Sequence, residues 1–93
     1  MHLIGIKVTF HFYYVESLKE KRRIIKSITD RVRSKFKISV AEVDYLDSLD
    51  RGALGFGVVS NNRNHAEQIL QKVLNQIDII SEIEVIQVEW FEA

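Results

Sequence analysis

The chain has 93 residues, of which 46% are apolar, 10% aromatic and 28% charged, and its formal net charge is zero. This length supports one domain, residues 1–93, and an apolar fraction of this size with balanced charge excludes an intrinsically disordered protein. The absence of cysteine excludes a disulfide scaffold and a cysteine-ligated metal site. No apolar run approaches the length of a membrane span, so we expect a protein of the reducing cytoplasm with no membrane contact.

The first predicted elements are a strand and a helix. Residues 2–13 have apolar side chains at every second position as far as Phe12, which is the period of a half-buried β-strand and not a signal peptide. Ser17 and Glu20 then form a capping-box pattern, and apolar residues recur at helical spacing as far as Phe36. An amphipathic helix of about five turns is therefore expected after the strand.

The rest of the chain predicts a hairpin, a second helix and a last strand. Residues 38–45 and 53–60 alternate as two strands, with a polar loop between them. Residues 60–62 offer N-cap side chains to a helix whose apolar stripe runs over 66–77, and residues 83–91 alternate as the final strand.

The resulting order, β-α-β-β-α-β, is the split βαβ pattern of a ferredoxin-like sandwich. In this α+β fold, right-handed crossovers place both helices on one face of a four-stranded antiparallel sheet. The first and third strands then lie in the centre, and the other face of the sheet stays open.

Positive charge is concentrated in the first predicted helix. Nine of the thirteen basic residues and only two acidic ones lie between Lys19 and Lys37, whereas the chain from Ile38 onward has three basic and ten acidic residues. A helical wheel places six basic side chains along one flank of the apolar stripe. These are Lys19, Arg22, Arg23, Lys26, Arg33 and Lys37, interrupted only by Asp30.

Three interpretations of this flank stay open. Clustered cations bind the phosphates of a nucleic acid, or pair internally with the acidic half of the chain, or dock an acidic partner protein. The prediction we favour is a non-enzymatic binding domain for structured or ribosomal RNA. Lys21 is included in this predicted interface, although the wheel places it in the apolar arc, where it either snorkels to water or contacts a ligand or backbone carbonyls.

The open sheet face predicts a homodimer. Glycines in the third strand permit close approach of another surface. The open-face positions of this strand have no aromatic side chain, and the first strand offers only His11 and Tyr13 near its end, so base stacking is not expected. The predicted interface consists of Leu3, Gly55, Gly57, Val59, Ile83, Val85 and Phe91. An alternative is that Lys7, Glu42 and Glu89 break up this apolar patch. A homodimeric protein-interaction module is accordingly the second functional prediction.

Signatures of catalysis and of metal binding are lacking. The acidic run of residues 42–50 does not have the spacing of an EF-hand, no two histidines are four residues apart, and the glycines of 52–57 do not form a phosphate-binding loop. We expect no enzymatic activity, cofactor or metal. The turn Ser60–Arg63 offers a helix N-terminus to an anion, but plain capping is the simpler interpretation.

Four segments carry a resemblance to a known family: residues 17–23 (SLKEKRR), 40–44 (VAEVD), 53–60 (ALGFGVVS) and 65–67 (HAE). The chain resembles the YlxP-like family of small uncharacterised bacterial proteins over essentially its whole length, and the block with Lys19, Lys21, Arg22 and Arg23 is the most specific part. The resemblance implies a ferredoxin-like fold without an assigned catalytic activity. It also implies a role associated with RNA or the ribosome, because genes of the family often lie beside genes for transcription and translation factors.

Overall fold

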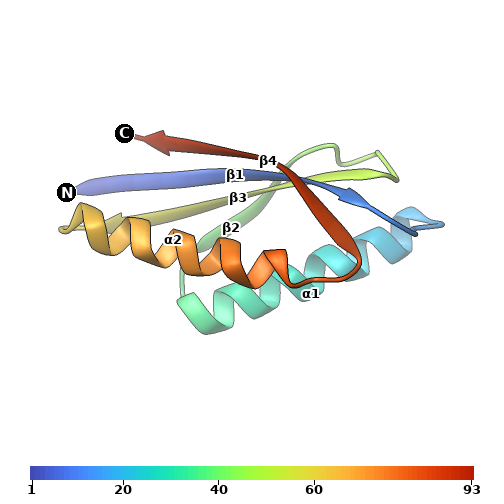
Figure 1. The fold of residues 1–93 in the computed structure, drawn as a ribbon, viewed down its shortest axis with the longest axis horizontal. Coiled ribbons are helices and arrows are strands. Elements are labelled where there is room, and N and C mark those ends of the chain that lie inside the picture. The colour runs from blue at the N-terminus through green and yellow to red at the C-terminus, as the bar shows by residue number, and fades with distance from the viewer.

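Two helices pack against one face of a four-stranded antiparallel sheet in the computed structural model, which describes all residues 1–93 (Figure 1). The elements are β1 (His2–Phe12), α1 (Leu18–Phe36), β2 (Ser39–Asp44), β3 (Arg51–Ser60), α2 (Arg63–Asp78) and β4 (Ile83–Glu92). The sheet order β2-β3-β1-β4, with β1 and β3 in the centre, is that of a ferredoxin-like α+β fold. The predicted fold class is confirmed. Neither helix is long and apolar enough to cross a membrane.

The core lies between the helices and the sheet. The inward parity of β1 supplies five of its side chains, as the alternation predicted: Ile4, Ile6, Val8, Phe10 and Phe12. The helices cover these residues with the apolar stripes expected from the sequence, and β3 adds the inward-facing residues of its own alternating pattern. Burial of this one apolar cluster is the main force that holds the two layers together.

The ends of β2 are set by two residues with left-handed backbone conformation. Lys37 has a φ of 54° and ends α1, and Tyr45 has a φ of 58° and turns the chain after β2. The strand consequently begins and ends one residue inside the predicted range 38–45. Strand β3 begins at Arg51, two residues earlier than predicted, because it continues its ladder with β1 up to the pair His11–Arg51.

Strand β4 carries a β-bulge that the sequence did not reveal. Thr9 of β1 pairs with Gln87, but the next residue of β1, Phe10, pairs with Val85, so that Ile86 is the extra residue. Because side chains alternate with a period of two, one inserted residue exchanges the faces of the strand beyond it. The two halves of β4 therefore have opposite parity.

The bulge corrects part of the predicted dimer interface. Ile83 and Val85 were expected on the open face, but the register turns both toward the helices. Ile83 is only 6% exposed and belongs to the core, and Val85 packs against it. These two residues are therefore core positions and are not available to a partner on the open face.

Candidate functional site

Helix α1 is held at its start by a capping box. The Ser17 hydroxyl oxygen accepts a hydrogen bond from the backbone N–H of Glu20 at 3.1 Å, and the Glu20 carboxylate accepts one from the N–H of Glu16 at 3.3 Å. The first contact satisfies a backbone donor that a helix N-terminus otherwise leaves unpaired, and the second holds the residue that precedes the N-cap. The side chains of the first turns therefore project from a defined backbone.

The basic flank, defined as Lys19, Arg22, Arg23, Lys26, Arg33 and Lys37, is exposed along the whole helix. Lys26 forms an ion pair with Asp30 at 2.6 Å. Arg33 donates a hydrogen bond of 2.7 Å to the Val40 carbonyl oxygen, which uses one guanidinium nitrogen. The other four cations have no carboxylate within 4.0 Å. Internal pairing with the acidic half of the chain does not cover this flank.

Three carboxylates of the acidic half form ion pairs away from the basic flank. Asp44 pairs with Lys7 at 3.0 Å on the open sheet face. Glu92 and Glu67 both pair with Arg63, at 2.9 Å and 3.4 Å, at the start of α2. These carboxylates leave the basic flank uncovered, and the ion pair between α1 and the acidic half of the chain is that of the buried Lys21 with Glu42, at 4.0 Å.

The helix dipole does not account for the position of these cations. Arg33 and Lys37 lie at the end of α1, where the dipole favours cations, but Lys19 lies in the first turn, where it disfavours them, and Arg22 and Arg23 follow in the second turn. A surface selected only for solubility would intersperse both signs of charge. A shallow depression with no apolar lining residue lies along this part of α1 and is bordered by Lys19, Arg22 and Arg23.

Lys21, which the sequence grouped with the nucleic-acid interface, does not belong to it. Its side chain is 1% exposed, and its ammonium donates hydrogen bonds to the carbonyl oxygens of Tyr45 at 2.5 Å and Ser48 at 2.6 Å. Burial lowers the pKa of Lys21, while the Glu42 carboxylate at 4.0 Å opposes that shift. Lys21 therefore fastens the β2–β3 loop to α1. Contact with backbone carbonyls was one of the alternatives that the sequence left open for this residue, and a buried ammonium is out of reach of a phosphate.

The open face retains five of the seven residues predicted for a dimer interface. Leu3, Val59 and Phe91 are half-exposed to exposed around Gly55 and Gly57. These three side chains lie on adjacent strands, because Leu3 pairs with Val59 across β1 and β3 and the neighbouring pair on β4 includes Phe91. The result is a shallow apolar trough on the open face, lined by Leu3, Gly5, Gly57 and Phe91.

The centre of this face carries an ion pair that spans a strand. Lys7 lies opposite Gly55 in the register of β1 and β3. The Lys7 side chain reaches across β3 and its ammonium donates a hydrogen bond of 3.0 Å to Asp44 on β2. This contact raises the pKa of Lys7 and holds the pKa of Asp44 below its ordinary value. The charge of Lys7 is therefore neutralised within the chain.

The turn before α2 is a helix cap. Asn62 is the N-cap residue, and its side-chain oxygen accepts a hydrogen bond from the N–H of His65 at 3.1 Å. Ser60 in turn accepts one from the N–H of Asn62 at 3.0 Å. Because Arg63 is engaged by two carboxylates, the structure bears out capping as the role of this turn.

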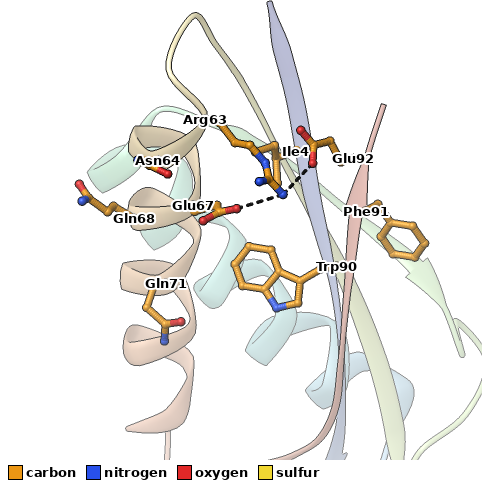
Figure 2. A pocket seen from close by; sticks show the side chains of 9 residues that line it. All are labelled: Ile4, Arg63, Asn64, Glu67, Gln68, Gln71, Trp90, Phe91 and Glu92. Carbon is orange, nitrogen blue, oxygen red and sulfur yellow. Dashed lines mark ion pairs between the residues drawn. The ribbon is translucent and has the colours of Figure 1, made fainter.

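A groove between α2 and β4, which the sequence analysis did not single out, has a volume of about 660 Å³ (Figure 2). The indole of Trp90 lies between the strand and the helix, with the amides of Gln68 and Gln71 on the helical side. Arg63, which forms ion pairs with Glu67 and Glu92, closes one end of the groove. The remaining lining residues are Ile4, Asn64 and Phe91. The one tryptophan of the chain was the signal available in the sequence.

Comparison with known proteins agrees with the resemblance inferred from the four segments. A family model described as "Protein of unknown function (DUF503)" matches residues 4–90. The chain is 43% identical over 81 residues to "Uncharacterized protein YlxP" of Bacillus subtilis (strain 168), and the aligned part covers 85% of this chain and 88% of the relative. Neither description names an activity, a ligand or a partner.

Proposed function

The chain belongs to the DUF503 family of proteins of unknown function, and we propose that it is a cytoplasmic, non-enzymatic domain that binds structured RNA, including ribosomal RNA. The surface that makes contact is the basic flank of α1. The observation that carries this proposal is that five of its six cations, all except Lys26, lack an internal carboxylate partner. Clustered Lys and Arg supply most of the sequence-independent affinity of a protein for nucleic-acid phosphates.

The geometry of the flank suits a phosphate backbone. From Lys19 to Lys37 the helix extends over about 27 Å, which is long enough for several consecutive phosphates. Apart from His11, whose ring packs edge-on against Tyr13 near one end of the sheet, the central strands expose no aromatic side chain on the open face. The group of aromatics on both central strands with which RRM domains stack unpaired bases is therefore lacking. These features favour recognition of the shape and charge of folded RNA.

The test is a titration of a short fluorescein-labelled RNA hairpin over a range of salt concentrations. Six phosphate contacts give a log–log slope of affinity against salt of about −4 to −5. Arg23→Glu should weaken binding about tenfold or more at low salt and make the slope shallower by about one to two. Arg31→Glu is the matched control, because Arg31 is also exposed but lies on the opposite flank of the same helix.

Two results would overturn the RNA proposal. One is an affinity that does not change with salt, and the other is an equal effect of Arg23→Glu and Arg31→Glu. Binding of polyglutamate without binding of the hairpin would favour an acidic protein as the partner of the flank instead.

A second proposal, dimerisation through the open face, is supported by Gly57. A Cβ atom built on Gly57 meets no atom within 4 Å, so nothing inside the chain requires a glycine there. Gly5 and Gly57 pair in the register and form the bare floor of the trough, and Phe91 stands beside it. Two copies related by a two-fold axis could each place Phe91 over the glycines of the other.

Gly57→Glu tests the dimer without disturbing the monomer. In a monomer the new side chain enters open space, whereas in a dimer it is buried in the apolar interface. Sedimentation velocity should therefore show a monomer in place of a dimer, and the thermal midpoint of the isolated chain should not change. Asn75→Glu, an exposed position on α2, is the control and should remain dimeric. A wild-type chain that is monomeric at all concentrations measured contradicts this proposal.

A further inference from the structure

The free edge of β4 presents unpaired backbone groups. Ala93 donates its N–H to the Leu3 carbonyl oxygen at 2.9 Å, which makes these residues a hydrogen-bonded pair of the antiparallel ladder. Bonded and non-bonded pairs alternate in such a ladder. The N–H and C=O groups of Val88, Trp90 and Glu92 therefore point away from β1, toward a position that a fifth strand would take.

The opposite edge of the sheet is protected against such an addition. Strand β2 has only six residues, and its register shifts between Glu42 and Asp44. Arg33 donates to the outward carbonyl of Val40 at 2.7 Å. Short edge strands, bulges and blocking cations are the usual means by which proteins prevent edge pairing. The stretch of β4 after its bulge, from Gln87 to Glu92, has regular register and no such cation.

The side chains beside this free edge face the groove and are incompletely covered. Helix α2 packs mainly over β3 and β1, so β4 projects beyond it. Trp90 is consequently 46% exposed although it lies on the helical face of the sheet, opposite the core residue Ile6. A strand added along β4 would direct every second side chain into the space between Trp90 and the amides of α2 (Figure 2).

The net negative charge at one end of the groove favours a partner segment that carries a positive charge. Arg63 is the one lining cation of the groove, and it is shared between Glu92 and Glu67. These three groups together carry a net charge of −1, and His2, whose Nδ1 lies 3.7 Å from the Glu92 carboxylate, offsets this charge only when its imidazole is protonated. A second copy of β4 is a poor occupant, because β4 has three glutamates and no Lys or Arg, and two acidic edges repel each other.

We propose that the groove between α2 and β4 binds an extended, basic peptide segment of a partner protein by β-strand addition. The segment pairs with the outward backbone groups of Val88, Trp90 and Glu92. One apolar side chain packs on the Trp90 indole, and a Lys or Arg two residues away, on the same face of the added strand, reaches Glu67 and Glu92. Main-chain bonds supply affinity in this mode of recognition, and alternate side chains supply specificity.

Trp90 is the only tryptophan of the chain, so its fluorescence reports directly on the groove. We expect the blocked peptide acetyl-Thr-Leu-Thr-Lys-Thr-Val-Thr-amide to change the Trp90 emission in a saturable way. Backbone N–H groups of Val88, Trp90 and Glu92 should exchange rapidly with solvent in the free protein and become protected when the peptide binds. Replacing the peptide lysine by glutamate should weaken binding about three- to tenfold. Methylating the backbone nitrogens of its leucine and valine, whose N–H groups face β4 when the added strand is antiparallel, should abolish it.

Variants of the protein locate the effect. Glu92→Gln should reduce the preference for lysine over glutamate in the peptide, whereas Glu89→Gln, on the open face of the same strand, should not. No emission change up to about 1 mM peptide would overturn the proposal. Protection of the three N–H groups without peptide, in a chain that sediments as a dimer, would instead identify a second copy as the occupant. Arg23→Glu should leave peptide binding intact, which separates this proposal from that of RNA binding.

Discussion

At the scale of one residue, Lys21 is a buried charge with a structural role. Its ammonium lies inside the protein, with two carbonyl acceptors from the β2–β3 loop and the Phe12 ring at 5.9 Å. Hydrogen bonds from a charged donor are about twice as strong as neutral ones and offset part of the cost of removing the charge from water. One side chain thus links α1 to a loop that otherwise has few anchors.

Lys21→Met should lower the free energy of unfolding by about 1–3 kcal/mol, because two charge-assisted hydrogen bonds are lost while the apolar stem is kept. Urea denaturation measures this change. Lys19→Met, on the exposed flank, should change stability by less than about 0.5 kcal/mol. The hairpin assay should respond in the opposite sense, with Lys19→Met weakening RNA binding and Lys21→Met leaving it unchanged. A loss of RNA affinity in folded Lys21→Met would contradict the structural role assigned to Lys21.

The ion pair of Lys7 and Asp44 predicts part of the acid dependence of stability. The pKa of Asp44 is lowered in the folded state by the hydrogen bond from Lys7. A carboxyl group with a lowered pKa contributes stability that is present above its unfolded pKa and is lost as the pH falls toward its folded one. In Asp44→Asn this contribution is absent, so the free energy of unfolding should fall less steeply below about pH 4. Urea titrations across the acid range measure the slope, and an unchanged slope would contradict the assignment.

At the scale of single elements, β4 is the informative case. Periodicity located the strand at residues 83–91, and the structure extends it by one residue. It also assigned one parity to the whole strand, which is correct for Phe91 and wrong for Val85 and Ile83. The bulge at Ile86 depends on how β4 pairs with β1, and no local feature of its sequence announces this pairing.

Two glutamate substitutions on β4 test the exchange of faces. Val85→Glu should destabilise the chain by about 2–3 kcal/mol, because it removes apolar packing and places a carboxylate against the core. Phe91→Glu should leave the stability of the monomer nearly unchanged, since Phe91 is 55% exposed on the open face. Thermal unfolding measures the stability of both variants relative to the wild type. Equal destabilisation would mean that the bulge does not exchange the faces.

At the scale of the whole molecule, the neutral chain is electrically polarised. The helical layer presents the cations of α1 on the side of β2, while the acidic strand β4 forms the opposite edge of the sheet. The open face, with its internal ion pair, lies on the far side of the sheet from the helices. Three surfaces of different chemistry are thus separated in space and can be altered one at a time.

This arrangement predicts that dimerisation does not strengthen binding of a short RNA. In a dimer formed through the open faces, both helical layers lie on the outside with two sheets between them, so a short hairpin contacts one basic flank only. The affinity per chain of Gly57→Glu for the hairpin should therefore equal that of the wild type. A marked loss of affinity in the monomeric variant would show that the two flanks act together.

Local periodicity by itself determined the order of elements, the fold class, the inward residues of β1 and β3 and the flank of α1 that carries the cations. These features depend on neighbouring positions in the chain, where the periods of 3.6 and 2 residues already specify which side chains share a face. Tertiary structure decided the burial of Lys21, the reversal of faces in β4 and the groove beside Trp90. Each of these depends on contacts between residues far apart in the sequence: the β2–β3 loop on α1, the register of β1 against β4, and the overhang of β4 beyond α2.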